Sequence, residues 1–181
     1  MSFIYCIFLI IIPVTCKSID ETKCLNIPLI KDFDIRKMVG NWVLHEAADE
    51  EEVLKKCIYY KTSLDANKGN TTYIVKRIWE NNSDSFNMYP VNNTSKFVTE
   101  WLGQIRMTWL VATDYNNYSI WYVCYPENPQ NSAFGISTRL FTINNNVMQK
   151  AKELVRKIGL HNLLPRLQNI NHENCFKQYK I

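Results

Sequence analysis

The sequence contains no hydrophobic run long enough to cross a bilayer, which takes about 20 consecutive apolar residues in a helix. The most apolar stretch, Phe3–Val14, covers only about a dozen positions, and polar sequence follows it. Small residues favour cleavage after Cys16, with cleavage after Ser18 as the alternative. We therefore predict a secretory signal peptide, residues 1–16, and one extracellular domain, residues 17–181, without stable membrane insertion.

A cluster of basic residues is also missing. The 21 Lys and Arg residues are scattered among 17 Asp and Glu residues, and the net charge is only +4. Binding of nucleic acid or heparin requires basic residues gathered on one surface. We therefore predict no nucleic-acid partner.

Motifs of metal sites and of common catalytic sites are absent as well. No C-x-x-C pair occurs, which argues against zinc and against a dithiol redox centre. No G-x-S-x-G surrounds any serine. The three histidines, His45, His161 and His172, are unclustered in the sequence and share no metal-ligand spacing. We predict no catalytic residue and no metal ion, and we do not expect an enzyme.

The cysteines indicate disulfide bonds. Two of the six, Cys6 and Cys16, fall in the predicted signal peptide, and an even number remains in an oxidising compartment. The remaining four are Cys24, Cys57, Cys124 and Cys175. They allow three pairings, and their spacing does not choose among them. Disulfides would leave no free thiol to act as a nucleophile.

Five Asn-x-Ser/Thr sequons follow the predicted signal peptide, and secretion would make them candidates for N-glycosylation. They are Asn70, Asn81, Asn92, Asn93 and Asn117. Two of them are adjacent, so we expect at most one of that pair to carry a glycan.

Short runs rich in Tyr, Val, Ile, Trp and Thr, separated by turn residues, predict strands from Trp42 to about Phe141. The clearest turn is Asp65–Gly69. We place strands near 41–47, 56–64, 71–79, 85–89, 96–101, 106–113, 117–124 and 133–141. Eight short antiparallel strands joined by hairpins are typical of an up-and-down β-barrel, so we predict an all-β fold.

After the last strand the hydrophobic period becomes helical. Apolar residues recur at Val147, Ala151 and Val155, Asn144 or Asn145 can cap the start, and Gly159 can end the helix. One amphipathic helix after eight strands must pack its apolar face on the outside of the barrel. We expect the tail, 160–181, to be irregular and to be fixed at its cysteine.

The segment 48–55 carries four consecutive acidic residues, Asp49 to Glu52. It separates the first two strands and can be a lid over the barrel or a solvated loop. We favour the solvated loop.

Three short motifs resemble those of the lipocalin family. They are Gly40-Asn41-Trp42 at the first strand, Thr113-Asp114-Tyr115 between two later strands, and Arg139 at the end of the last strand. The window from Trp109 to Cys124 is similar to that of apolipoprotein D and insect bilin-binding lipocalins. With the four cysteines and the single helix, the resemblance covers the whole predicted domain.

The resemblance implies structural roles for these residues. It pairs the cysteines as Cys24–Cys124 and Cys57–Cys175. It places Trp42 at the closed end of the barrel with the Arg139 guanidinium over its indole. Asp114 is expected to accept backbone N–H bonds in the adjacent turn.

The resemblance also implies a ligand cavity inside the barrel. With Trp42 pointing inward, strand parity turns Leu44, Ala133, Gly135 and Ser137 inward and His45 outward, which argues against haem. The matching lipocalin positions add Tyr60, Thr62, Tyr73, Val75, Arg77, Thr108, Leu110, Ser119 and Trp121.

Such a lining suits a small hydrophobic ligand with a polar end. The resemblance implies a secreted carrier of a bilin, sterol, fatty acid derivative, retinoid or odorant, with no cofactor unless the guest is a pigment such as a bilin. The alternative is an extracellular protein-binding or inhibitory lipocalin that acts through its loops.

Overall fold

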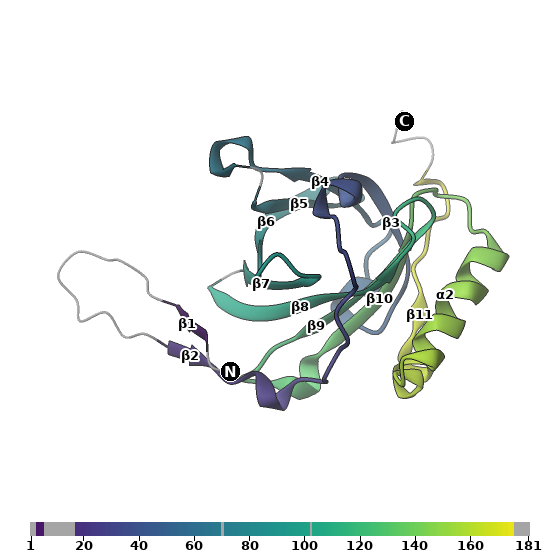
Figure 1. Ribbon diagram of the computed structural model, residues 1–181. Coiled ribbons are helices and arrows are strands. Elements are labelled where there is room, and N and C mark those ends of the chain that lie inside the picture. Colours follow the sequence, from purple (N-terminus) through teal and green to yellow (C-terminus); the bar gives the residue numbers. More distant parts are fainter. Residues whose placement is uncertain (1–2, 6–16, 70, 102, 176–181) are drawn as a thin grey trace.

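The computed structural model describes residues 3–5, 17–69, 71–101 and 103–175 (Figure 1). Most of the predicted signal peptide and the sequon at Asn70 lie outside the described residues. Within the first 19 residues, a short strand β1, Phe3–Tyr5, pairs antiparallel with β2, Lys17–Ile19.

Eight antiparallel strands form a closed barrel. Each strand pairs with the next along the chain, and the last pairs back with the first, so the sheet closes on itself. The strands are β3 (Gly40–Ala47), β4 (Tyr59–Leu64), β5 (Tyr73–Trp79), β6 (Asn82–Pro90), β7 (Lys96–Trp101), β8 (Gln104–Thr113), β9 (Tyr118–Cys124) and β10 (Ala133–Thr138). The predicted all-β fold and strand order are confirmed.

Short helical turns occupy several of the connections. Aspartates cap four of them, because their side chains accept the backbone N–H groups that a first turn leaves unpaired. The turns are η1 (Glu21–Lys23), η2 (Ile35–Met38), α1 (Glu50–Val53), η3 (Ala66–Lys68) and η4 (Pro129–Asn131). The predicted turn at Asp65–Gly69 contains η3, and Gly69 ends it with a φ of 63°.

Trp42 and Arg139 close one end of the barrel. The Arg139 Cζ lies 3.7 Å from the centroid of the Trp42 ring. The guanidinium also donates to the carbonyl oxygens of Lys37, Val39, Asn41 and Tyr115, at 2.8–3.1 Å. The resemblance implies the contact with the indole; the hydrogen bonds show in addition that one charged side chain holds η2, the start of β3 and the β8–β9 turn together.

Gly40 and Asp114, the small and the acidic residue of these motifs, make the contacts of Arg139 possible. Gly40 has a φ of 118°, and a Cβ there would lie 2.9 Å from the Arg139 Nη1. Asp114 Oδ1 accepts from the backbone N–H groups of Asn116, Asn117 and Tyr118. The turn and the close approach of the arginine therefore depend on both residues.

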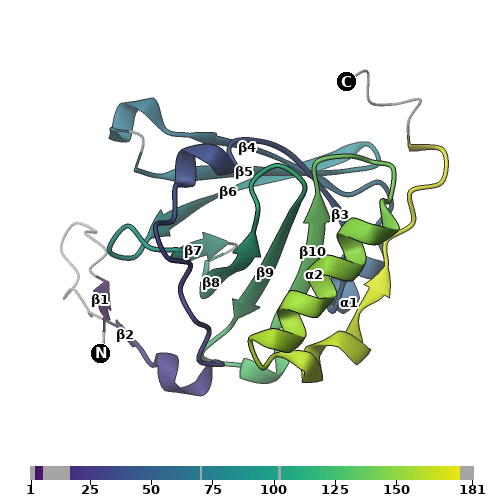
Figure 2. The ribbon, with the colours of Figure 1, turned by 45° about the vertical axis from the view of Figure 1, so that its right-hand side comes forward.

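The helix α2, Asn145–Lys157, packs along the outside of the barrel (Figure 2). Asn144 caps it by accepting from two backbone N–H groups. Met148, Ala151 and Val155 are buried in the same cluster as outward-facing side chains of β8 and β9. Gly159 follows with a φ of 82°, so the predicted helix, caps and packing are confirmed.

The tail is more regular than expected. It forms a 3-10 segment, η5 (His161–Arg166), and a short strand, β11 (Gln168–Asn169). β11 pairs with Glu46 and Ala47 of β3, beyond the part of β3 that β4 reaches. The prediction of an irregular tail is therefore wrong, because this exposed edge of β3 offers unpaired backbone groups.

Two disulfides fix the chain ends to the barrel. Cys24 bonds to Cys124 and Cys57 to Cys175, across 100 and 118 residues. These are the pairs that the resemblance implies. Each closes a long loop of the unfolded chain and therefore contributes about 2–4 kcal/mol to stability.

The tail also brings two histidines together, which the sequence spacing did not predict. His45 points out of the barrel, but the tail covers it completely, and its ring lies 5.1 Å from that of His172. The His45 Nε2 lies 2.9 Å from the carbonyl oxygen of Leu140, so this nitrogen carries the proton. The two rings meet because the Cys57–Cys175 disulfide returns the tail to β3.

Candidate functional site

The barrel encloses a cavity of about 120 Å³. It reaches from Trp42 at the closed end to Glu52, Arg77, Arg106 and Tyr125 at the other. Its walls are mainly apolar and aromatic. Because side chains alternate across each strand, every second residue of the surrounding strands turns towards it.

Most of the residues predicted from parity and resemblance line this cavity. They are Leu44, Tyr60, Thr62, Tyr73, Val75, Arg77, Thr108, Trp121, Ala133, Gly135 and Ser137. Leu110 does not reach it. This residue is buried in the cluster below the cavity, with Met38, Trp42 and Phe97. Its predicted place in the lining is therefore wrong, because the base of the barrel is filled by side chains.

Ser119 is also outside the lining. It is fully buried, and its Oγ accepts a hydrogen bond from the Trp121 Nε1 at 3.1 Å. Its role is to hold the indole of Trp121, whose ring faces the cavity and packs against Phe97 at 6.1 Å between centroids.

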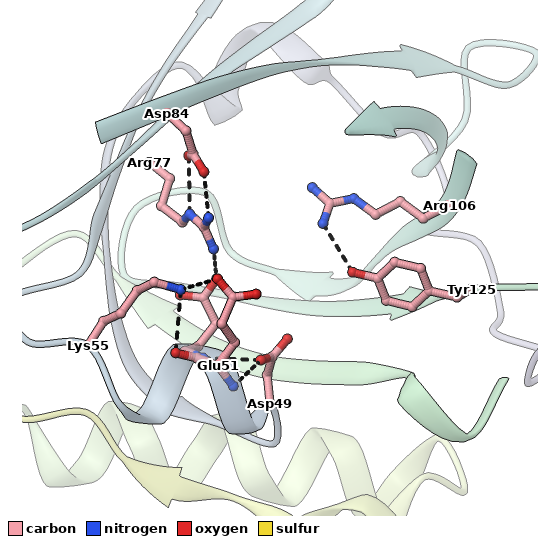
Figure 3. A network of polar contacts seen from close by, with 8 residues as sticks. Asp49, Glu51, Lys55, Arg77, Asp84, Arg106 and Tyr125 are labelled. Carbon is pink, nitrogen blue, oxygen red and sulfur yellow. Dashed lines mark hydrogen bonds and ion pairs between the residues drawn. The ribbon is translucent and has the colours of Figure 1, made fainter. Parts of the chain in front are cut away.

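Arg77 is the centre of an ionic network at the cavity (Figure 3). Its Nε and Nη2 donate to the two carboxylate oxygens of Asp84, and its Nη1 donates to Glu52. The side chains of Arg77 and Glu52 are 6% and 12% exposed. Although burial disfavours the charged form of Arg77, the bonds from Asp84 and the charge of Glu52 outweigh it and raise the pKa of the guanidinium.

Glu52 reaches the cavity from α1. Asp49 accepts from the backbone N–H groups of Glu51 and Glu52, which begins a helical turn and aims Glu52 at Arg77. Burial raises the pKa of Glu52, and the charge of Arg77 opposes that shift. Of the four acidic residues in this segment, only Glu50 and Glu51 are exposed. The favoured solvated loop is therefore wrong for Asp49 and Glu52, which line the cavity.

Arg106 is the second cation of the cavity. Its Cζ lies 4.7 Å from the ring centroid of Phe86 and 4.8 Å from that of Trp101. Its Nη1 lies 3.4 Å from the hydroxyl of Tyr125. Figure 3 shows this pair on the other side of the view from the Arg77 network.

Comparisons with known proteins agree with this architecture. No family model matches the sequence. Bovine (Bos taurus) apolipoprotein D is 29% identical over 111 residues, which are 56% of this chain and 57% of the relative. The alignment thus spans little more than half the length of that curated relative.

Solved structures match over most of the chain. The cockroach allergen Per a 4 superposes with a TM-score of 0.67 at 20% identity, covering 85% of this chain and 98% of the allergen. Insecticyanin from the tobacco hornworm Manduca sexta gives 0.66 at 17% identity, covering 87% and 90%. The chain has the lipocalin fold. A tryptamine complex of the amine-binding protein of Rhodnius prolixus gives 0.61 at 19% identity, covering 81% of this chain and 85% of that protein.

Several residues of the cavity lining were not predicted from the sequence. They are Ala47, Asp49, Glu52, Phe86, Met88, Arg106, Val123, Tyr125 and Phe134. Parity could have found some of them, since Arg106 lies two residues before Thr108 and Val123 two after Trp121. Nothing in the strand pattern indicates Asp49 and Glu52, because they come from a helical turn outside the barrel.

Among the described residues, no three His, Cys, Asp or Glu side chains are grouped to hold a metal ion. Within the same residues, no helix is long and apolar enough to cross a membrane.

Proposed function

We propose that this protein belongs to the lipocalin family and is a secreted carrier that holds a small hydrophobic ligand in its barrel cavity. The observation that carries the proposal is the cavity itself, closed at its base by Trp42 and walled by aromatic side chains such as Tyr60, Phe86 and Trp121. Sites of this kind bury most of a small apolar guest.

The volume of the cavity limits the size of the ligand. An engineered apolar cavity of about 150 Å³ accepts benzene, and this one measures about 120 Å³. A guest with a single aromatic ring therefore suits the observed side-chain positions. A bilin, sterol or retinoid would require larger rearrangements of the lining, so we propose a compact ligand of odorant size.

Secretion and glycosylation belong to the same proposal. The predicted signal peptide and the two disulfides support an extracellular compartment. Asn81, Asn92, Asn93 and Asn117 are all exposed, but the side-chain amide of Asn117 donates to Asp114 at 2.8 Å within its turn. We therefore propose glycans at Asn81 and at one of the adjacent pair in preference to Asn117.

A binding experiment tests the carrier function. Trp121→Ala removes an aromatic wall of the cavity, and we expect it to weaken the binding of indole, a neutral probe, roughly tenfold in calorimetric titration. Leu140→Ala removes an apolar side chain that is 68% exposed and outside the cavity lining, so it should leave the affinity unchanged.

Native mass spectrometry of the secreted full-length protein tests the same proposal without a chosen probe. A carrier is expected to release a bound small molecule on denaturation. Equal affinity of wild type and Trp121→Ala for indole, with no co-purified ligand, would contradict the carrier function and favour the alternative of a protein-binding lipocalin that acts through its loops.

A further inference from the structure

The two arginines of the cavity differ in their partners. Arg77 makes three hydrogen bonds to the carboxylates of Asp84 and Glu52. Among the described residues, Arg106 forms no ion pair, and its one hydrogen bond, to the Tyr125 hydroxyl, is long at 3.4 Å. Its Nε is buried without a partner. A cation with unused donors therefore borders the ligand cavity.

Aromatic stacking does not use these donors. Phe86 and Trp101 lie within 5 Å of the Arg106 Cζ and interact with the positive charge of its planar group. The N–H groups of a guanidinium point outward in its plane, where they match the two oxygens of a carboxylate. Stacking thus fixes the orientation of Arg106 and leaves its N–H edge for an acceptor.

Each acidic side chain near the cavity already has a partner, although the second oxygen of Glu52 is buried without a hydrogen bond among the described residues. Asp84 and one oxygen of Glu52 bind Arg77, and an oxygen of Asp49 caps α1. An ammonium group entering the cavity would have to compete with these contacts and would meet the charge of Arg106. An anion would meet an unpaired cation and the Tyr125 hydroxyl.

We propose that Arg106 and Tyr125 bind the carboxylate of the ligand, and that the guest is a compact apolar acid whose hydrocarbon part lies among the aromatic walls. This inference rests on the proposed carrier function and names its ligand class. The carboxylate accepts from the free N–H groups of Arg106, and Tyr125 contributes its hydroxyl as a second donor.

Three ligands with one hydrocarbon skeleton test the proposal: 3-phenylpropionate, propylbenzene and 3-phenylpropylamine. Calorimetric titration of the full chain at pH 7.4 should give roughly tenfold tighter binding of the acid than of propylbenzene, and weaker binding of the amine than of either. Arg106→Gln should remove the preference for the acid and keep the affinity for propylbenzene, which also shows that the variant is folded.

A matched variant separates local from general charge effects. Lys76 is exposed on β5 and outside the cavity lining, so Lys76→Gln removes the same charge and should leave the preference for the acid unchanged. Tyr125→Phe should weaken binding of the acid about threefold.

Each contrary outcome has its own meaning. If propylbenzene binds as well as the acid, if the amine binds more tightly, or if the acid preference survives Arg106→Gln, the ligand class is wrong while the carrier function stands. If none of the three ligands binds, the carrier function loses its support as well.

Discussion

The side chain of His45 is ionisable, and it is fully buried. Burial is the main reason that its pKa falls to about 4; the backbone bond to Leu140 opposes this shift and the nearby His172 adds to it. Its Nδ1 has no hydrogen-bond partner among the described residues. A second proton there would be buried without an acceptor, so the folded protein keeps this ring neutral.

The buried ring makes stability depend on pH. Between pH 6.5 and 4 the unfolded chain binds a proton at position 45 that the folded chain does not, so the free energy of unfolding decreases as the pH falls. The full effect is about 3 kcal/mol, and stability is highest above pH 6.5. Denaturant titrations at a series of pH values should show this slope.

Two variants test whether His45 causes this pH dependence of the free energy of unfolding. His45→Gln should flatten the slope, because glutamine keeps a side-chain donor but does not titrate. His161→Gln, on an exposed side chain, should leave it as in wild type. A free energy of unfolding that stays constant from pH 7 to pH 4.5 would contradict the assignment.

For single residues, the sequence predicted which way a side chain points better than it predicted which residues that side chain contacts. Strand parity correctly turned His45 out of the barrel and Gly135 into it. It could not predict that a tail more than 120 residues later would cover His45, because no local pattern encodes that contact. A Cβ at Gly135 would lie 3.0 Å from Leu44 Cδ1, so Leu44 already fills part of the space beside this glycine.

The short helix α1 is the element that brings an acidic side chain to the cavity. It is a single turn, Glu50–Val53, which is too short to be stable without its cap. Asp49 supplies that cap through two hydrogen bonds, and Glu52 anchors the turn to Arg77 of β5. The turn therefore bridges a loop and a barrel strand.

Removing the cap should loosen α1 without opening the barrel. We expect Asp49→Ala to cost about 1 kcal/mol and to speed the hydrogen exchange of the Glu51 and Glu52 amides, which lose their acceptor. Asp65→Ala removes the equivalent cap of η3, away from the cavity, and should leave the exchange in α1 unchanged. Unchanged exchange in Asp49→Ala would show that Glu52 alone holds the turn.

Regular elements could be predicted from the sequence and this turn could not. The strands and α2 have hydrophobic periods of two and of about 3.6, which give both their type and their buried face. The run Asp49 to Glu52 has no apolar member, so composition favoured a solvated loop. Glu52 turns inward because it pairs with Arg77, which lies 25 residues later on β5.

For the whole molecule, two disulfides join the barrel to the segments outside it. The Cys57–Cys175 bond is the nearest covalent anchor of β11 and of His172, which covers His45. We expect Cys57→Ala with Cys175→Ala to lower the free energy of unfolding by about 2–4 kcal/mol. Release of the tail should also return the pKa of His45 towards about 6.5, as measured by NMR titration.

The other disulfide provides the control. Cys24→Ala with Cys124→Ala should cost a similar free energy, because its loop is of similar length, but should leave the pKa of His45 low. An unchanged pKa in the Cys57 and Cys175 variant would mean that β-pairing alone holds the tail in place.

The two bonds overlap along the chain, since residues 57–124 lie inside both closed loops. Any single peptide bond between residues 24 and 175 can therefore be cut without separating the two pieces. A cut within β4 to β8 leaves them joined by both sulfur bridges. A protease that nicks an outer loop would produce a clipped protein that still migrates as one species until a reductant is added.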